Sequence, residues 1–270
     1  DVVGGSHSAV GQRAVLWSAG NMQDLGQLPG SVGSNAALSI NNLGQVVGYS
    51  GQRAFLWTSA AGMQSLGDLT GGQGFSEAVA INDVGQVAGY AANEEAFHAF
   101  LWTSAGGMQD LGDLPGGENF SHALDLSAHG HVVGYSIGET GYLPFLWTPE
   151  TGMQSLGDLP DGIGYSLAWG INAHGQVVGT SDSVSGGRPF LWTSSGGMQN
   201  LNDLLDESGE GWTIFFANDI NDHGQIAVYG FSPDGSPHGA LLTPVPEPST
   251  FVLAVVGLCG VLFVARRRAR

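Results

Sequence analysis

The sequence contains no lysine and only seven arginines, four of which lie within the last five residues. The rest of the chain therefore sets 24 acidic residues against three arginines. Such a surface repels phosphate backbones, so we expect no nucleic-acid partner. We attribute the acidity to solubility, with calcium binding as the alternative.

Cysteine and catalytic motifs are also scarce. The single cysteine, Cys259, lies in an apolar stretch near the C-terminus, so no intrachain disulfide can form. The sequence starts at Asp1 without an initiator methionine or an export signal, which is typical of a processed or truncated N-terminus. No nucleophile elbow, phosphate loop or zinc-protease motif occurs, so we expect a protein that is not an enzyme.

Glycine, by contrast, is abundant at 45 residues, and the chain repeats itself. Five short apolar runs each end in a tryptophan: Trp17, Trp57, Trp102, Trp147 and Trp192. The last four runs are each followed by a Leu-Gly-Asp-Leu element or a close variant of it. Self-similarity at a fixed period near 45 residues is typical of repeat architectures.

One repeat, residues 53–90, contains four predicted strands. They are residues 54–58, 63–66, 76–81 and 86–90, separated by glycine-rich turns. Between the copies no segment has the apolar spacing of a helix. Four short strands in about 45 residues match one blade of a β-propeller, so we predict an all-β propeller spanning residues 1–244.

The two ends of the repeat region carry half-units. Residues 1–5 align with the fourth strand of a repeat, and residues 240–243 align with the first. We therefore predict six blades, the last closed by residues 240–243 and 1–5, with its two middle strands upstream of Asp1. Five blades with two spare strands is the alternative.

Insertions point to a contact face. The connection from the fourth strand to the next first strand is longer after Tyr90, Tyr135, Thr180 and Tyr229 than after Tyr49. Insertions confined to one connection map to one face of a repeat protein, which is the usual binding face.

The last complete repeat carries an additional insertion that contains Glu207, Glu210 and Trp212. Aromatic residues beside acids can stack on sugar rings, so these three are the candidate ligand-binding residues. A locally repacked terminal blade is the simpler interpretation.

Two residue sets raise the question of metal binding. His129, His174 and His223 occupy equivalent turns, which would spread them around a ring. Four repeats carry an aspartate at the same position: Asp68, Asp113, Asp158 and Asp203. A ring of these carboxylates could hold calcium, but capping of the adjacent loop is the favoured role. We predict no metal site and no cofactor.

The composition changes abruptly after Thr243. A proline-rich spacer (244–248) precedes an apolar run (251–265) and the arginines Arg266, Arg267 and Arg268. The run is shorter than the roughly 20 residues of a comfortable membrane span, and the arginines favour a cytoplasmic C-terminus. We predict a hydrophobic helix within a separate region, residues 245–270.

This tail resembles the PEP-CTERM sorting signal, with Pro246, Glu247 and Pro248 as the motif itself. The resemblance implies recognition by an exosortase and removal of the hydrophobic tail after a transient stay in the inner membrane. It also implies delivery to the surface or extracellular matrix of a Gram-negative bacterium that makes exopolysaccharide.

The repeats are similar to the HAF family of extracellular repeats. His98-Ala99-Phe100 is a literal copy of the naming motif, and Leu101-Trp102 follow it. This resemblance covers most of residues 1–244 and implies an exported repeat protein, without a known substrate.

Together these features predict a non-enzymatic module that binds exopolysaccharide or a surface protein. A secreted glycan hydrolase using Glu207 or Glu210 is the alternative, and a purely structural matrix component is a third.

Overall fold

The computed structural model describes residues 1–8, 11–72, 74–184 and 186–245. Within them the chain forms 22 β-strands and two short 3-10 helices, η1 (Leu201–Leu204) and η2 (Glu207–Gly209). The prediction of an all-β fold is confirmed. The predicted C-terminal helix lies outside the described residues.

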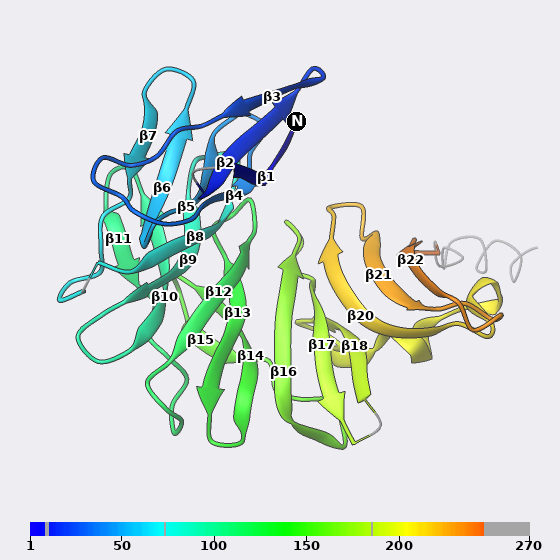
Figure 1. Cartoon of the computed structure of the whole chain (residues 1–270). Coiled ribbons are helices and arrows are strands. Elements are labelled where there is room, and N and C mark those ends of the chain that lie inside the picture. The colour runs from blue at the N-terminus through cyan, green and yellow to red at the C-terminus, as the bar shows by residue number, and fades with distance from the viewer. Residues whose placement is uncertain (9–10, 73, 185, 246–270) are drawn as a thin grey trace, which may run out of the picture.

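The strands form six consecutive antiparallel sheets (Figure 1). The first contains β1 (Val2–Ser8), β2 (Gly11–Ser18) and β3 (Asn21–Asp24). The second contains β4 (Asn35–Ile40), β5 (Val46–Ser50), β6 (Arg53–Thr58) and β7 (Gly62–Ser65). The third contains β8 (Ser76–Ile81), β9 (Val87–Ala92), β10 (Phe97–Thr103) and β11 (Gly107–Asp110).

The fourth sheet contains β12 (Ser121–Leu126), β13 (Val132–Gly138), β14 (Gly141–Thr148) and β15 (Gly152–Ser155). The fifth contains β16 (Gly162–Ile171), β17 (Val177–Ser183), β18 (Gly186–Thr193) and β19 (Gly197–Asn200). The sixth contains β20 (Thr213–Ile220), β21 (Ile226–Phe231) and β22 (Pro237–Leu242). A single parallel pairing, Tyr142 with Tyr165, links the fourth and fifth sheets.

The boundaries of the sheets do not coincide with those of the predicted blades, because each sheet combines strands from two repeats. Residues 53–90 do not form one sheet: β6 and β7 pair with β4 and β5, whereas β8 and β9 belong to the next sheet. Loop length explains the difference. Only Gly51 and Gln52 separate β5 from β6, so these strands close as a hairpin, with Gly51 at φ +63°. Ten residues separate β7 from β8, enough for the chain to cross to the next sheet.

The same shift accounts for the chain ends. The strand predicted at residues 240–243 corresponds to β22, which pairs with β21 in the sixth sheet. The strand predicted at residues 1–5 lies within β1, which pairs with β2 in the first sheet. The predicted closing blade is therefore not present among the described residues.

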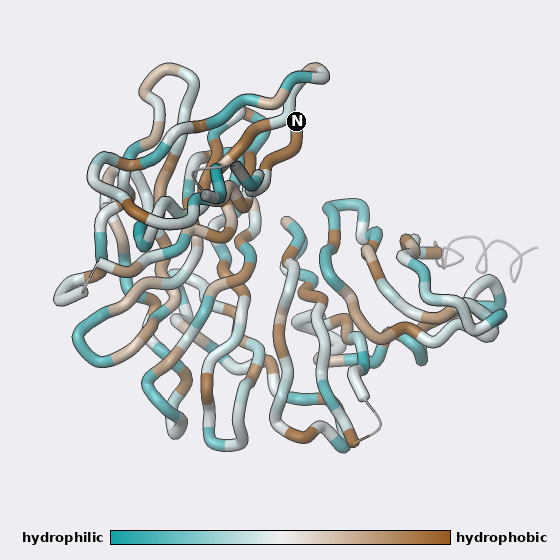
Figure 2. The backbone as a smooth tube through the Cα atoms, in the orientation of Figure 1, coloured by the Kyte–Doolittle hydropathy of each residue, from teal (hydrophilic) through white to brown (hydrophobic). Residues whose placement is uncertain are grey.

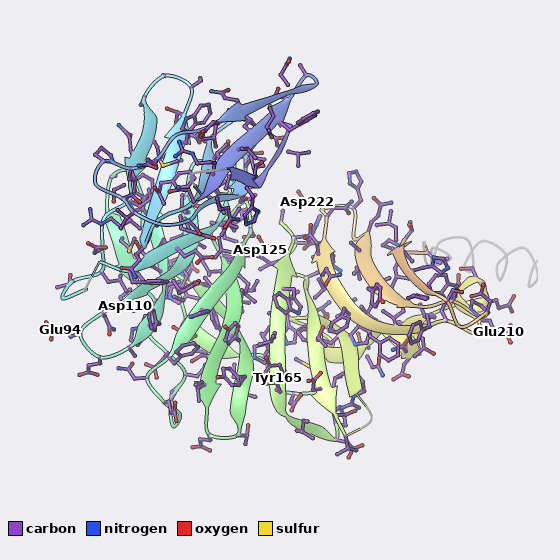
Figure 3. The ribbon with its side chains drawn as sticks, in the orientation of Figure 1. Glu94, Asp110, Asp125, Tyr165, Glu210 and Asp222 are labelled. Atoms are coloured by element: carbon purple, nitrogen blue, oxygen red, sulfur yellow. The ribbon has the colours of Figure 1, made fainter. Side chains whose placement is uncertain are left out.

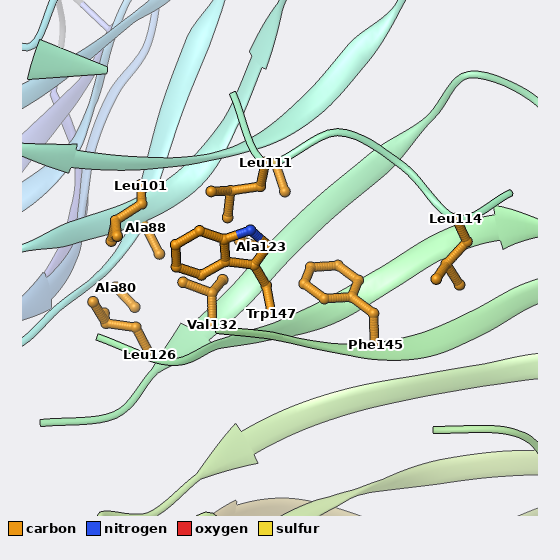
Figure 4. Packing of buried hydrophobic residues seen from close by; sticks show 11 residues of the cluster. Ala80, Ala88, Leu101, Leu111, Leu114, Ala123, Leu126, Val132, Phe145 and Trp147 are labelled. Atoms are coloured by element: carbon orange, nitrogen blue, oxygen red, sulfur yellow. The ribbon is translucent and has the colours of Figure 1, made fainter. Parts of the chain in front are cut away.

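Neighbouring sheets pack face to face, and an apolar cluster lies in each of the five junctions. Figure 4 shows the junction between the third and fourth sheets, where Trp147 and Phe145 pack beside Leu101 and Leu111. Hydrophobic residues follow the strands, whereas hydrophilic residues are frequent in the connections (Figure 2). The packing matches the core role expected of the repeated tryptophans.

Tryptophan burial depends on position in the array. Trp57 and Trp147 are each 6% exposed, and Trp102 and Trp192 are partly buried. Trp17, on the outward side of the first sheet, is 51% exposed. The six sheets form an arc that is open between β1–β3 and β20–β22 (Figure 1). Closure of the arc into a propeller remains a prediction.

Turns between the first two strands link the second sheet to the third, the third to the fourth and the fifth to the sixth. The Asn41 side-chain amide donates to the Asn82 carbonyl at 3.0 Å, and Asn82 donates to the Ser127 carbonyl at 3.1 Å. Asn172 donates to the Asn221 carbonyl in the same way at 3.1 Å. These asparagines are therefore structural, in agreement with the turn chemistry of the motif.

Candidate functional site

In the second to sixth sheets, one end carries the hairpin between the second and third strands, and the equivalent hairpin of the first sheet joins β1 and β2. Because the strands are antiparallel, the first strand of each of the second to sixth sheets begins at this same end. Hairpins β13–β14 and β17–β18 project together toward the bottom of Figure 1. We call this end the hairpin face. The connections that the sequence predicts as a contact surface are these hairpins, and in β13–β14 and β17–β18 the added residues lengthen the strands.

A continuous row of aromatic rings crosses the hairpin end of the third, fourth and fifth sheets. Its members are Phe75, Tyr90, Phe97, Phe120, His122, Tyr135, Tyr142 and Tyr165. We call this set the aromatic row. It comes from strands of three sheets and from the residues that directly precede β8 and β12.

His122 lies at the centre of the aromatic row. Its ring stacks on Tyr90 at a centroid distance of 3.7 Å and on Phe120 at 4.6 Å. Tyr90 belongs to the third sheet and His122 to the fourth, so the stack bridges a junction. Tyr135 lies 5.3 Å from His122 on its own sheet. Stacked and edge-on aromatic pairs at such distances stabilise the packing beyond the area that they bury.

The electrostatics of the row favour an uncharged surface. Burial lowers the pKa of His122 to about 4, so its imidazole is neutral at physiological pH. Its Nδ1 and the Tyr135 hydroxyl are 3.0 Å apart, whereas Nε2 is buried without a partner. The Tyr90 hydroxyl donates to Glu77 at 2.8 Å, and burial together with this carboxylate raises the pKa of Tyr90.

The row ends at an exposed ring. Tyr165 is 46% exposed and meets Tyr142 edge-on, with centroids 5.3 Å apart (Figure 3). The backbones of β14 and β16 are close here, because a Cβ on Gly141 would lie 2.3 Å from the Gly164 carbonyl oxygen. Glycine at both positions therefore allows the parallel pairing that holds Tyr142 beside Tyr165. An open, rigidly held tyrosine is well suited to stacking on a flat ligand.

The histidine of the His-Ala-Phe motif, His98, is held by hydrogen bonds that connect neighbouring strands. His98 is buried, and its Nδ1 donates to the Asp110 carboxylate at 2.8 Å. Its Nε2 faces the Asn119 side-chain oxygen, and the Asn93 side-chain amide lies 3.0 Å from Nδ1. The hydrogen bond to Asp110 is the main reason why the pKa of His98 is raised, and burial opposes it. This network ties β10 to β11 and to the loop before β12.

A groove lies between the fifth and sixth sheets. It has a volume of about 680 Å³. Trp212, one of the sequence-predicted ligand residues, lines it. Glu207 and Glu210 do not: they lie exposed on and beside η2. Of the three predicted residues only Trp212 therefore lines the groove, and no observation favours Glu207 or Glu210 as a catalytic acid.

One of the recurring aspartates, Asp158, caps a loop. Asp158 accepts hydrogen bonds from the hydroxyls of Ser166 and Ser181 and from the Gly164 backbone. Burial opposes the effect, but these bonds lower the pKa of Asp158. Within the described ranges no three acidic, histidine or cysteine side chains lie together as metal ligands would. Asp68 and Asp203 are exposed, and Asp113 is half-buried.

A different acid is buried on an inner strand. Asp125 of β12 accepts backbone hydrogen bonds from Ile171 at 2.9 Å and Leu126 at 2.8 Å, bridging the fourth and fifth sheets. Burial raises the pKa of Asp125 to about 7 despite these bonds, and the charge on Asp219 adds to the effect. Turn residues His129, His174 and His223 belong to three different sheet ends and are not grouped.

Sequence reasoning missed the aromatic row, although the sequence carries its signal. Phe75, Phe120 and Tyr165 each precede a serine and are spaced by the repeat period, as are Tyr90 and Tyr135. The signal was weak because each aromatic alone is compatible with an ordinary core residue.

Comparison with known proteins concerns mainly the tail. Residues 244–269 match the family model described as the PEP-CTERM protein-sorting motif, which confirms that part of the sequence prediction. The match indicates an exported protein that an exosortase processes. Pro246, Glu247, Pro248 and the arginines Arg266, Arg267 and Arg268 lie outside the described residues. No helix in the described part of the chain is long and apolar enough to cross a membrane.

No curated protein matches the chain. Among solved structures, the chain is similar to the extracellular domain of BT4673, a protein of B. thetaiotaomicron described as a one-component system. The two share 11% identity with a TM-score of 0.49 over 90% of this chain. The aligned part is 31% of the other chain, so this chain spans about a third of its length.

Proposed function

We propose that the protein is an exported, non-enzymatic module that binds extracellular polysaccharide through its hairpin face. The observation that carries this proposal is the aromatic row, which crosses three sheets and ends at the exposed Tyr165. The resemblance of the repeats to HAF proteins supports the same class, and the sorting motif supports delivery to the cell envelope of a Gram-negative bacterium.

The net charge of the chain limits which polysaccharides it can bind. With a formal net charge of −17, the protein repels polyanions, so the proposed ligand is an uncharged glycan. Neutral His122 at the centre of the row adds no positive charge that would recruit an acidic sugar. Tyr165 would stack on a sugar ring, and the half-buried rings behind it would hold its position.

The test is glycan-array binding followed by titration of the best ligand with Tyr165→Ala. Removing a central aromatic contact commonly costs more than about 1.4 kcal/mol, so we expect affinity to fall at least about tenfold. Tyr229→Ala is the matched control, because Tyr229 is 41% exposed but lies outside the row. Unchanged binding by Tyr165→Ala would contradict the proposal, and turnover of the bound glycan would favour the hydrolase.

A further inference from the structure

The groove between the fifth and sixth sheets exists because the sixth sheet differs from the others. In the second to fifth sheets, a phenylalanine and a tryptophan of the third strand face the preceding sheet, as Phe190 and Trp192 do in β18. The register of β22 places Ala240 and Leu242 at these two positions. Both residues line the groove. Loss of the two large rings leaves apolar space that the other junctions fill.

In the described part of the chain, the sixth sheet also has no counterpart of the short fourth strand. In the fifth sheet β19 pairs with β18, and Met198 packs against the junction cluster. Among the described residues β22 pairs with β21 alone, so its outer edge carries unpaired backbone groups. The groove opens beside this edge, since Ala240, Leu241 and Leu242 all line it.

The outward side of the same strand is uncovered as well. Leu101 of β10 is 6% exposed because it lies in one cluster with Leu111 and Leu114, which follow β11, and with Trp147 of the next sheet. Leu241 occupies the equivalent position in β22 and is 60% exposed. Among the described residues, β22 therefore has no fourth strand beside it, with its methionine and the two leucines after it, and no further sheet to cover Leu241.

We propose that the groove and the free edge of β22 bind an extended peptide segment of the repeat's own type, Gly-Met-Gln-x-Leu-Gly-x-Leu, as a fourth strand. Its methionine would enter the groove against Leu201 and Ile226, and its leucines would cover Leu241. Backbone pairing with an exposed edge supplies affinity, and the alternating side-chain contacts supply selectivity. The occupant follows from the interface already present four times in the chain, at β7, β11, β15 and β19.

The test titrates the purified chain with a synthetic peptide of residues 107–114, Gly-Met-Gln-Asp-Leu-Gly-Asp-Leu, by calorimetry. A peptide with aspartate in place of methionine is the control ligand. We expect saturable binding of the first peptide, at least tenfold tighter than that of the control, together with a rise in thermal stability.

Two variants locate the binding. Leu241→Asp changes an exposed side chain at the proposed site, and Leu43→Asp changes a leucine that is 70% exposed in a turn of the second sheet. We expect the first variant to weaken peptide binding at least tenfold and the second to leave it unchanged. Equal binding of both peptides, or equal effects of both variants, would overturn the proposal. Stabilisation by a fatty acid but not by the peptide would instead assign the groove to an acyl chain.

Discussion

Trp147 and Trp17 hold the same position in their sheets, yet only Trp147 is covered by a preceding sheet. Trp147 is 6% exposed and Trp17 is 51% exposed. A tryptophan buries about 200 Å² at about 25 cal/mol per Å², or about 5 kcal/mol when fully covered. We therefore predict that Trp147→Ala lowers the free energy of unfolding by about 3–5 kcal/mol. Trp17→Ala should cost about 2 kcal/mol or less, because half of its area is already in water and no closed cavity forms.

The measurement is urea unfolding followed by circular dichroism, with Trp57→Ala as an internal control. Trp57 is also 6% exposed, so its variant should match Trp147→Ala. If Trp17→Ala costs as much as the two buried variants, the outward side of the first sheet is covered in solution. That result would refute an open arc and support the ring that the sequence predicts.

Two further predictions concern pH. The raised pKa of His98 means that its pairing with Asp110 stabilises the fold fully below about pH 6.5 and that this contribution is lost as pH rises through the raised folded-state value. His98→Gln should remove this decline in melting temperature above pH 6.5; an unchanged slope would contradict the assigned role. The pKa of Asp125 is shifted in the same direction: its folded-state pKa of about 7 exceeds its unfolded value of about 3.9, so stability falls as pH rises from about 4 to 7. Asp125→Asn should remove the fall in stability across that pH range. If stability still falls there in the variant, another group causes the fall.

Local sequence patterns predicted the strands well because strand formation depends on turn residues and apolar runs. The repeat containing Trp57 yields four strands close to their observed bounds. The grouping into sheets was wrong because the repeat has no natural starting point in the sequence. Only the contrast between the two-residue turn at Gly51 and the ten-residue connection before β8 reveals which strands pair.

The candidate site was harder to predict because its parts converge only in three dimensions. Tyr90 and His122 are separated by most of a repeat, and only the face-to-face packing of two sheets stacks their rings. The terminal insertion drew attention to Glu207 and Trp212, but only the tryptophan is among the residues that line the groove. A side chain's direction at a helical turn depends on backbone geometry that residue spacing does not reveal.

The offset between repeat and sheet has a consequence for how such chains can change length. Each internal sheet takes its first two strands from one sequence repeat and its last two strands from the next repeat. Removing residues 58–102, one full period, joins Trp57 to Thr103, and the halves left on either side then combine into one complete sheet. Gene duplication or deletion in whole periods can therefore lengthen or shorten the array without leaving a broken sheet inside it.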